Sequence, residues 1–180
     1  AITMRSIAEE RRTGTIELLF TRPISDLKII LAKYLASVTL MIVALLPTII
    51  YYISMYNLAE DPSKFDHGAT ITSYIGLILL GATFVAIGIF TSALTSSQIV
   101  AFILALFLCW LFIPEIGGIA LLGSYNVMES FDSVVQYFGM SYHYDGIQKG
   151  VIDTKNIVYF LSAIALFIYA ALTVIKSMKK

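Results

Sequence analysis

Two histidines are the clearest candidates for chemistry in this sequence. His67 lies in a loop with Asp61 and Asp66, and His143 lies two residues before Asp145. Imidazole and carboxylate groups can share a metal ion or act as acid and base in hydrolysis. The two histidines lie on separate loops and no serine nucleophile motif accompanies them, so we predict no metal site and favour solvent-exposed or interface histidines. A membrane enzyme that uses His143 and Asp145 stays a remote alternative.

The composition restricts the class of protein more strongly than these residues do. Of the 180 residues, 58% are hydrophobic and 13% are charged, with a formal net charge of zero; the mean hydropathy is +0.85. Average soluble domains carry about 25% charged residues. The composition therefore excludes a disordered chain, a basic nucleic-acid binder and an ordinary water-soluble domain. The single cysteine, Cys109, excludes a disulfide framework within the chain and is interpreted as a small buried hydrophobe.

Long stretches without charged residues predict an all-α integral membrane protein. No acidic residue, lysine or arginine occurs at 34–59, 67–114 or 156–175. A membrane helix needs about 20 mostly apolar residues, so the first and last stretches each fit one span and the middle one fits two, separated by a polar turn at 91–98. These observations predict four transmembrane helices, at 28–53, 72–94, 98–113 and 156–176. Residues 1–27 precede the first span, and residues 114–155 form an extracytoplasmic segment.

The distribution of basic residues predicts the orientation. Nine lysines and arginines lie in residues 1–33 and 176–180, against three in 54–71 and 114–155. Basic residues near span ends favour the cytoplasm. Four spans place both visible termini on the same side, so both are predicted to be cytoplasmic.

The segment before the first span is amphipathic and carries both signs of charge. Gly14 is placed to end one helix in a left-handed conformation, and a second short helix at 15–21 is expected to stop before Pro23. Ser25 and Asp26 are expected to cap the first membrane helix. A helix that rests on lipid headgroups is usually basic on its polar face, whereas alternating glutamates and arginines beside apolar residues favour a protein partner. Both interpretations stay open on periodicity alone.

This segment also carries a resemblance to a known family. The string at 5–25, Arg-Ser-Ile-Ala-Glu-Glu-Arg-Arg-Thr-Gly-Thr-Ile-Glu-Leu-Leu-Phe-Thr-Arg-Pro-Ile-Ser, closely resembles the permease subunits of ABC-2 type transporters. In that family, a Glu-x-x-x-Gly-Thr-x-Glu-x-Leu pattern followed by a proline marks the cytoplasmic coupling helix before the third membrane helix. The turn at 92–101 is similar to the turn between the family's fourth and fifth helices. Residues 150–153 are similar to the gliding-motility-associated permeases of the GldF type.

The resemblance implies how the chain is organised. It covers essentially all of 1–180, which would form a single ABC-2 permease domain. Members usually have six spans, so four visible spans and an opening on the coupling element imply an N-terminally truncated chain. Residues 1–27 would be the cytoplasmic coupling element. The protein would lie in the bacterial inner membrane.

The resemblance also implies that this chain is not an enzyme. A separate cytoplasmic ATPase subunit would bind ATP and Mg and hydrolyse the nucleotide, because no phosphate-loop motif occurs here. This chain would hold no cofactor. Its partners would be that ATPase, a second permease half that is either identical or different, and the lipid bilayer, with no nucleic acid. The energy of hydrolysis would drive export or the assembly of gliding machinery; a membrane scaffold or assembly factor without transport is the alternative.

Nine residues are predicted to form the ATPase-coupling site on the strength of this resemblance. They combine apolar anchors, orienting charges and corner-forming residues: Glu10, Arg12, Gly14, Thr15, Ile16, Glu17, Leu19, Phe20 and Pro23. Gly14 either contacts the ATPase or serves only the backbone. Pro47, inside the first span, either kinks the helix passively or acts as a hinge for transport.

Overall fold

The computed structural model describes residues 2–15, 24–58, 66–112, 139–148, 150 and 153–178. Within these ranges the chain forms helices and turns and no strand, so the predicted all-α class is confirmed. The helices are α1 (Ala8–Arg12), α3 (Asp26–Leu45), α4 (Thr48–Leu58), α5 (His67–Leu94), α6 (Gln98–Phe112), α9 (Met140–Gln148) and α10 (Thr154–Met178).

Three stretches are long and apolar enough to cross a membrane. They are Asp26–Leu58, His67–Leu94 and Thr154–Met178, and they contain the predicted spans 28–53, 72–94 and 156–176. Helix α6 lies at the remaining predicted span, 98–113, and has 15 residues. A helix that crosses a membrane needs about 20. Residues 113–138, which follow it, lie outside the described part of the chain.

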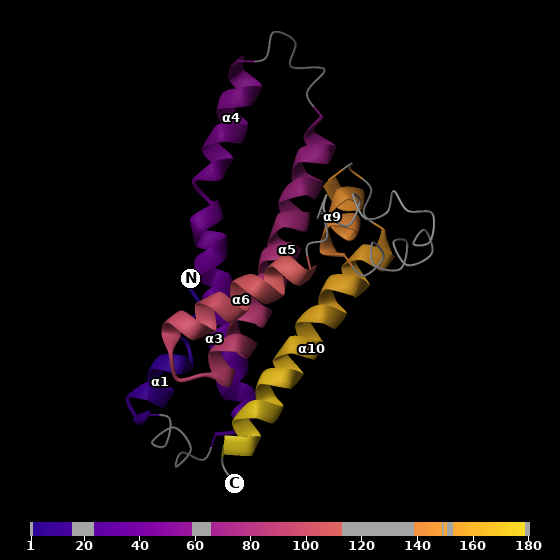
Figure 1. Ribbon diagram of the computed structural model, residues 1–180. Coiled ribbons are helices and arrows are strands. Elements are labelled where there is room, and N and C mark those ends of the chain that lie inside the picture. Colours follow the sequence, from indigo (N-terminus) through magenta and orange to yellow (C-terminus); the bar gives the residue numbers. More distant parts are fainter. Residues whose placement is uncertain are drawn as a thin grey trace, which may run out of the picture.

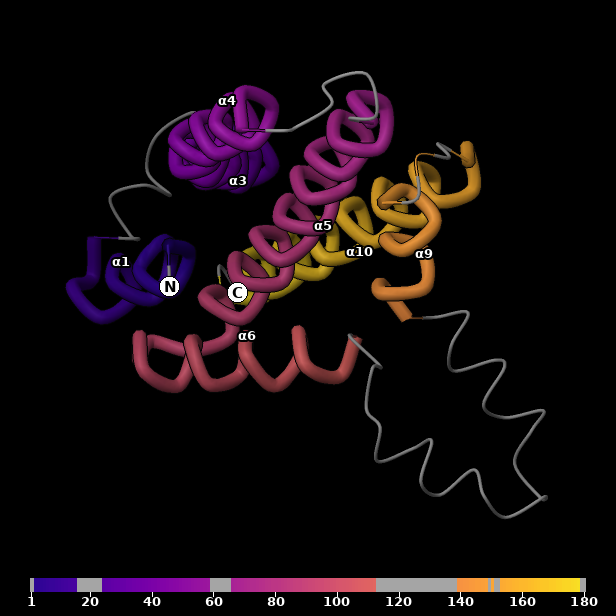
Figure 2. Tube along the Cα trace, turned by 90° about the horizontal axis from the view of Figure 1, so that it is seen from above, coloured from indigo at the N-terminus to yellow at the C-terminus, as the bar shows by residue number. Residues whose placement is uncertain are grey.

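Helix α5 is the centre of the bundle. It packs against α3, α6, α9 and α10, and 56% of its most apolar stretch is buried, against 11% for Asp26–Leu58 and 22% for α10. Figure 1 shows α3, α4, α5 and α10 running along the length of the molecule, whereas α6 crosses it obliquely. From above, α6 lies along one side of the bundle, with α3 and α4 on the other side of α5 (Figure 2).

The first long stretch is divided at a proline. Helix α3 ends at Leu45 and α4 begins at Thr48, which leaves Leu46 and Pro47 between them. Proline cannot donate a backbone hydrogen bond. The turn after it is tighter than a regular α-helical turn, because its bonds join residues three apart: Ile49 N–H donates to Leu46 O and Ile50 N–H to Pro47 O, each at 3.1 Å.

Two groups of buried side chains hold the helices together. The first joins the N-terminal segment to the spans and consists of Ile7, Ile30, Val85, Ile89, Ala93, Ala171, Leu172 and Ile175. The second joins α9 to α5 and α10 and consists of Ala86, Ile87, Met140, Ile147, Phe160 and Phe167. Glycines on α5 allow close approach, since a Cβ on Gly81 would meet the Met41 side chain and one on Gly88 would meet Thr3.

Several local expectations need correction. Residues 141–146, whose mostly polar side chains are typical of a turn, belong to α9, because Met140, His143 and Ile147 lie on one helix face and are buried. The polar turn expected at 91–98 is confined to 95–97, since α5 continues to Leu94. Ser25 occupies the N-cap of α3, but its side chain makes no capping bond.

Candidate functional site

The N-terminal segment is fastened to the end of α5 through one serine hydroxyl. Ser92 Oγ accepts hydrogen bonds from the backbone N–H groups of Ile7 and Ala8, both at 3.0 Å, and donates to Met4 O at 3.2 Å. Ser92, Ile7 and Ala8 are all buried. A hydroxyl can donate one bond and accept two, so Ser92 is fully used. The two N–H groups belong to the start of α1, where a helix has unpaired donors.

Two arginines extend this attachment. Arg11 Nη1 donates to Ala93 O at 2.8 Å, which satisfies a carbonyl in the last turn of α5. Basic side chains commonly bond the last carbonyls of a helix and interact well with its dipole. Arg5 Nε donates to Gln98 Oε1 at 3.1 Å, at the first residue of α6. The segment therefore contacts α5 and α6 through polar bonds as well as apolar packing.

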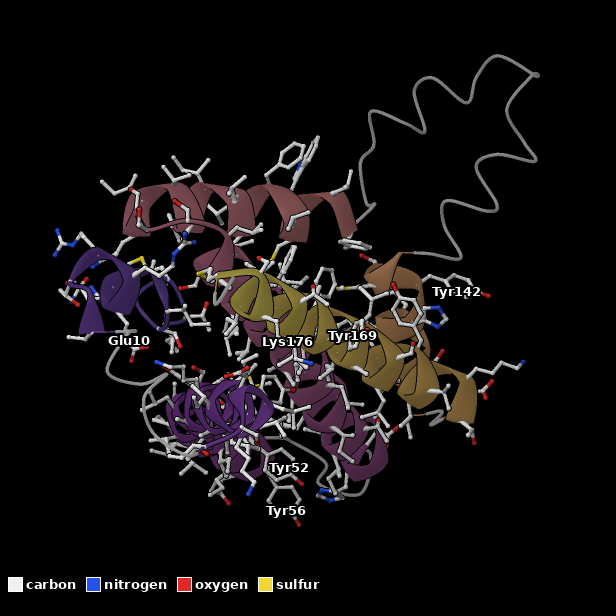
Figure 3. The ribbon with its side chains drawn as sticks, turned by 90° about the horizontal axis from the view of Figure 1, so that it is seen from below. Glu10, Tyr52, Tyr56, Tyr142, Tyr169 and Lys176 are labelled. Carbon is white, nitrogen blue, oxygen red and sulfur yellow. The ribbon has the colours of Figure 1, made fainter. Side chains whose placement is uncertain are left out.

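A lysine on α3 makes the third attachment. Lys33 Nζ lies 2.6 Å from Glu10 Oε1 and donates to Ser6 O at 2.5 Å. Both charged side chains are largely shielded, with 20% of Lys33 and 32% of Glu10 exposed. Glu10 Oε2 is buried without a hydrogen-bond partner in the described part of the chain. Figure 3 shows Glu10 on the side of α1 that faces α3.

The predicted coupling residues thus differ in position. Glu10 turns towards α3, whereas Arg12 is exposed over 64% of its side chain and pairs with Glu9 at 2.8 Å. Thr15 is exposed and bonds to Thr13, Oγ1 to Oγ1, at 2.9 Å. The other members, Ile16, Glu17, Leu19, Phe20 and Pro23, lie outside the described residues.

Gly14 adopts the left-handed conformation that its position implied. Its φ is +71°, and a Cβ placed on it would have no neighbour within 4 Å in the described structure. Only glycine takes this conformation without steric cost. Glycine is therefore favoured here by the backbone conformation and not by close packing against the described residues.

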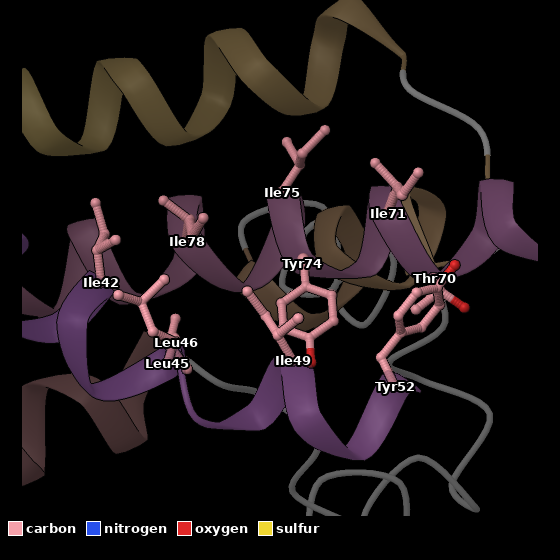
Figure 4. Close-up of a pocket in the computed structure, with 10 residues that line it drawn as sticks. All are labelled: Ile42, Leu45, Leu46, Ile49, Tyr52, Thr70, Ile71, Tyr74, Ile75 and Ile78. Atoms are coloured by element: carbon pink, nitrogen blue, oxygen red, sulfur yellow. The ribbon is translucent and has the colours of Figure 1, made fainter. Parts of the chain in front are cut away.

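An apolar pocket of about 290 Å³ lies at the opposite end of the same helices, between α3, α4 and α5. Tyr74, one of its lining residues, shares a hydrogen bond between its OH and Thr48 Oγ1, at 3.0 Å. The ten lining residues, drawn in Figure 4, are Ile42, Leu45, Leu46, Ile49, Tyr52, Thr70, Ile71, Tyr74, Ile75 and Ile78. The break at Pro47 lies beside this pocket, so a change in the angle between α3 and α4 would alter its shape.

The histidines are held in separate polar contacts. His143 is buried on α9, where Nδ1 lies 2.8 Å from Asn156 Oδ1 and the ring stacks on Tyr159 with centroids 4.0 Å apart. Asp145 is exposed. His67 begins α5, and its Nδ1 lies 2.5 Å from Tyr52 OH. Among the described residues, no three histidine, cysteine or acidic side chains come together as a metal site would require.

Sequence reasoning missed Lys33 and Ser92, the two side chains that fasten α1. Lys33 is the last charged residue before the first apolar stretch, a position consistent with an interfacial anchor. Ser92 was assigned to a polar turn. A hydroxyl inside an apolar helix was the available signal, because it needs a bonding partner when buried.

A bundle with three apolar helices of spanning length and a polar segment packed on one end defines a multi-pass membrane protein. The family described as "ABC-2 family transporter protein" matches residues 1–179, and the chain belongs to this family. It is a membrane component of an ABC transporter. A comparison with curated proteins found no match.

Proposed function

We propose that this chain is the permease half of an ABC exporter and that residues 1–27 couple it to a separate ATPase subunit. The proposal is supported most directly by the three-way attachment of α1. Lys33 ties it to α3, Ser92 ties it to α5, and Gln98 receives Arg5 from the segment just before it. A displacement of α1 would therefore be passed to three membrane helices at once. Such rigid-body transmission is how an energy-supplying subunit can change a membrane pathway.

The exposed side of the segment is suited to a protein partner. Arg12 and Glu9 present a mixed-charge pair to solvent, and complementary charges set orientation and specificity at interfaces. Gly14 then turns the chain towards residues 15–23, whose apolar members are proposed as anchors in a groove of the ATPase. Glu10 is proposed to serve the attachment to α3 and not the outer contact.

Pro47 is proposed as a hinge in the same movement. Helices α3 and α4 share no continuous hydrogen-bonding ladder across Leu46 and Pro47, so the outer half of the span can tilt separately. The pocket beside it would change volume as α4 moves.

A role in assembling gliding machinery is a second candidate, favoured by the resemblance at residues 150–153. Gly150 has φ +86°, a conformation that needs glycine. Both candidate functions place the hydrolysis of ATP in a partner chain, and neither requires a cofactor in this chain. Both put the cytoplasm on the α1 side of the bundle, in a bacterial inner membrane.

The test is capture of the ATPase subunit by the membrane-embedded chain. Gly14→Pro cannot adopt a positive φ, and Glu17→Arg reverses a proposed docking charge. We expect either change to reduce ATPase capture severely, while Lys155→Gln, an exposed lysine on α10, leaves capture unchanged. Equal capture by all variants would show that residues 1–27 do not dock the ATPase. Capture with ATP hydrolysis but no movement of any substrate would favour the scaffold alternative.

A further inference from the structure

A polar cavity of about 750 Å³ lies where the N-terminal segment meets the start of α6. It is lined by side chains from both elements: Arg5, Glu9, Arg12, Ser96, Ser97, Gln98 and Ile99. This volume falls in the range of sites that hold small ligands or headgroups, which is roughly 300–1,000 Å³. The cavity thus offers a concave polar surface at one end of a membrane protein.

The charges in the cavity favour an anion. Arg5 uses one N–H group, Nε–H, to bond Gln98, and its other four N–H groups have no partner among the described residues. Arg12 Nη2 pairs with Glu9 Oε1 at 2.8 Å. Two arginines against one glutamate leave one net positive charge. A guanidinium with free N–H groups presents the planar fork that binds phosphate oxygens in pairs.

An apolar stripe runs from this cavity along α6. Ile99 lines the cavity itself, and Ile103, Leu106 and Trp110 follow it at spacings of four, three and four residues, which place them on one helix face. All four side chains are more than half exposed, at 72%, 58%, 54% and 56% respectively. Phe107 adds a ring to this face, with its centroid 6.2 Å from that of Trp110.

The stripe is continuous with the cavity. Eleven residues separate Ile99 from Trp110, which at about 1.5 Å per residue gives about 16 Å along α6. A polar cavity with an anion-binding arginine at one end and an apolar face that continues from it therefore fits an amphipathic ligand with an anionic head.

We propose that this surface binds an anionic phospholipid of the surrounding membrane. The phosphate bonds to Arg5 and Arg12 in the cavity, and one acyl chain lies along Ile99, Ile103, Leu106 and Trp110. Basic residues next to a membrane attract anionic lipids by about 1 kcal/mol each, or about fivefold in affinity. Because the cavity includes residues of both the N-terminal segment and α6, a bound lipid would also stabilise their contact.

Trp110 is the only tryptophan in the chain and reports directly on the stripe. The purified full chain in neutral detergent is titrated with phosphatidylglycerol or phosphatidylcholine that carry the same brominated acyl chains, since bromine quenches tryptophan fluorescence on contact. We expect brominated phosphatidylglycerol to quench Trp110 at lower concentration than brominated phosphatidylcholine does. In Arg5→Gln/Arg12→Gln the phosphatidylglycerol affinity should fall by about fivefold for each arginine lost.

Two matched variants make the result specific. Lys176→Gln removes an exposed charge at the same end of the bundle and should keep the preference for phosphatidylglycerol. Arg5→Lys/Arg12→Lys keeps both charges and should retain most of it. Circular dichroism of each variant verifies that the helices are intact.

Equal quenching by the two lipids in the unmodified chain would overturn the proposal. So would a preference for phosphatidylglycerol that survives Arg5→Gln/Arg12→Gln, or one that Lys176→Gln weakens as much. No ATPase is present in these titrations, so failure here leaves the coupling proposal standing.

Discussion

Lys33 Nζ on α3 lies 2.6 Å from Glu10 Oε1 on α1, and the same ammonium group donates to Ser6 O. The pair connects the segment proposed for coupling to the first membrane helix of the described chain. With one carboxylate oxygen of Glu10 buried and unpaired in the described structure, the lysine carries most of the compensation for that charge. Loss of either partner would leave a shielded charge without its counter-ion.

Replacing Lys33 should therefore loosen α1. We expect Lys33→Met to lower the free energy of unfolding by about 1–3 kcal/mol, because a partly buried charged acceptor loses its donor. Denaturant titration in micelles measures the change. Lys155→Met is the matched control, since Lys155 is 81% exposed and lies 3.7 Å from Asp153; exposed pairs contribute about 0–1 kcal/mol. A smaller loss in Lys33→Met than in Lys155→Met would contradict the structure.

Ser92→Ala should detach the start of α1 from α5. The substitution removes the acceptor of Ile7 and Ala8 N–H, two donors in a buried region, at a cost of about 1–3 kcal/mol. Amide hydrogen exchange at residues 7 and 8 should accelerate by about fivefold or more. Ser162→Ala, where the hydroxyl bonds only within α10, should leave these two amides protected. Unchanged protection in Ser92→Ala would show that the hydroxyl does not hold the segment.

Gly88→Ala should be more disruptive than Gly81→Ala. A Cβ at position 88 meets the short, branched side chain of Thr3, whose Cβ lies 2.9 Å away, whereas a Cβ at position 81 meets the flexible end of Met41. Overpacking costs about 1–3 kcal/mol where the neighbour cannot move. Thermal unfolding of both variants measures the difference, and Thr3→Ala should partly rescue Gly88→Ala. Equal destabilisation by the two alanines would argue against this close approach.

Gly14 should tolerate asparagine better than alanine. Its φ of +71° costs a non-glycine residue about 1–2 kcal/mol, and asparagine adopts this region more readily than alanine. Since a Cβ at this position meets none of the described residues within 4 Å, we expect the difference to reflect backbone conformation. Binding of the ATPase should decrease in the order glycine, asparagine, alanine. Full binding by Gly14→Ala would mean that this corner is not needed for docking.

His143→Ala should weaken the docking of α9 without removing a catalytic function. The imidazole bonds to Asn156 and stacks on Tyr159, so its loss opens space in a packed region and costs about 2–4 kcal/mol. Limited proteolysis near residues 139–148 should become faster, while ATPase capture at the other end persists. Loss of a hydrolytic activity in a stable variant would instead support the remote alternative of a membrane enzyme.

The long helices could be predicted because their physical cause is local. A long stretch without charged residues is suited to the membrane core, and the fixed thickness of that core sets the length of a spanning helix. The approximate positions of the helices follow from where such stretches occur. The left-handed conformation of Gly14 is also local, as only the steric freedom of glycine permits it.

The attachments of α1 depend on contacts distant in the sequence. Ser92 bonds to residues 84 and 85 positions away, and hydropathy does not reveal which end of a helix another segment covers. The polar neighbours of Ser92 in the sequence favoured a turn. Ser92 lies instead within α5, where its buried hydroxyl accepts hydrogen bonds from the N–H groups of Ile7 and Ala8. The α9 segment is hard to recognise for a similar reason, because its polar residues conceal the buried face formed by Met140, His143 and Ile147.

The central claim is that movement of α1 is passed to the membrane helices. The most direct measurement is the distance between spin labels at Leu40 on α3 and Tyr169 on α10, in a Cys109→Ala background with the ATPase subunit bound. Both positions are exposed and lie outside the proposed coupling site. We predict that ATP changes this distance, and that Lys33→Met/Ser92→Ala abolishes the change while the bound ATPase still hydrolyses ATP. An unchanged distance in the unmodified protein, or an equal change in the variant, would contradict the account.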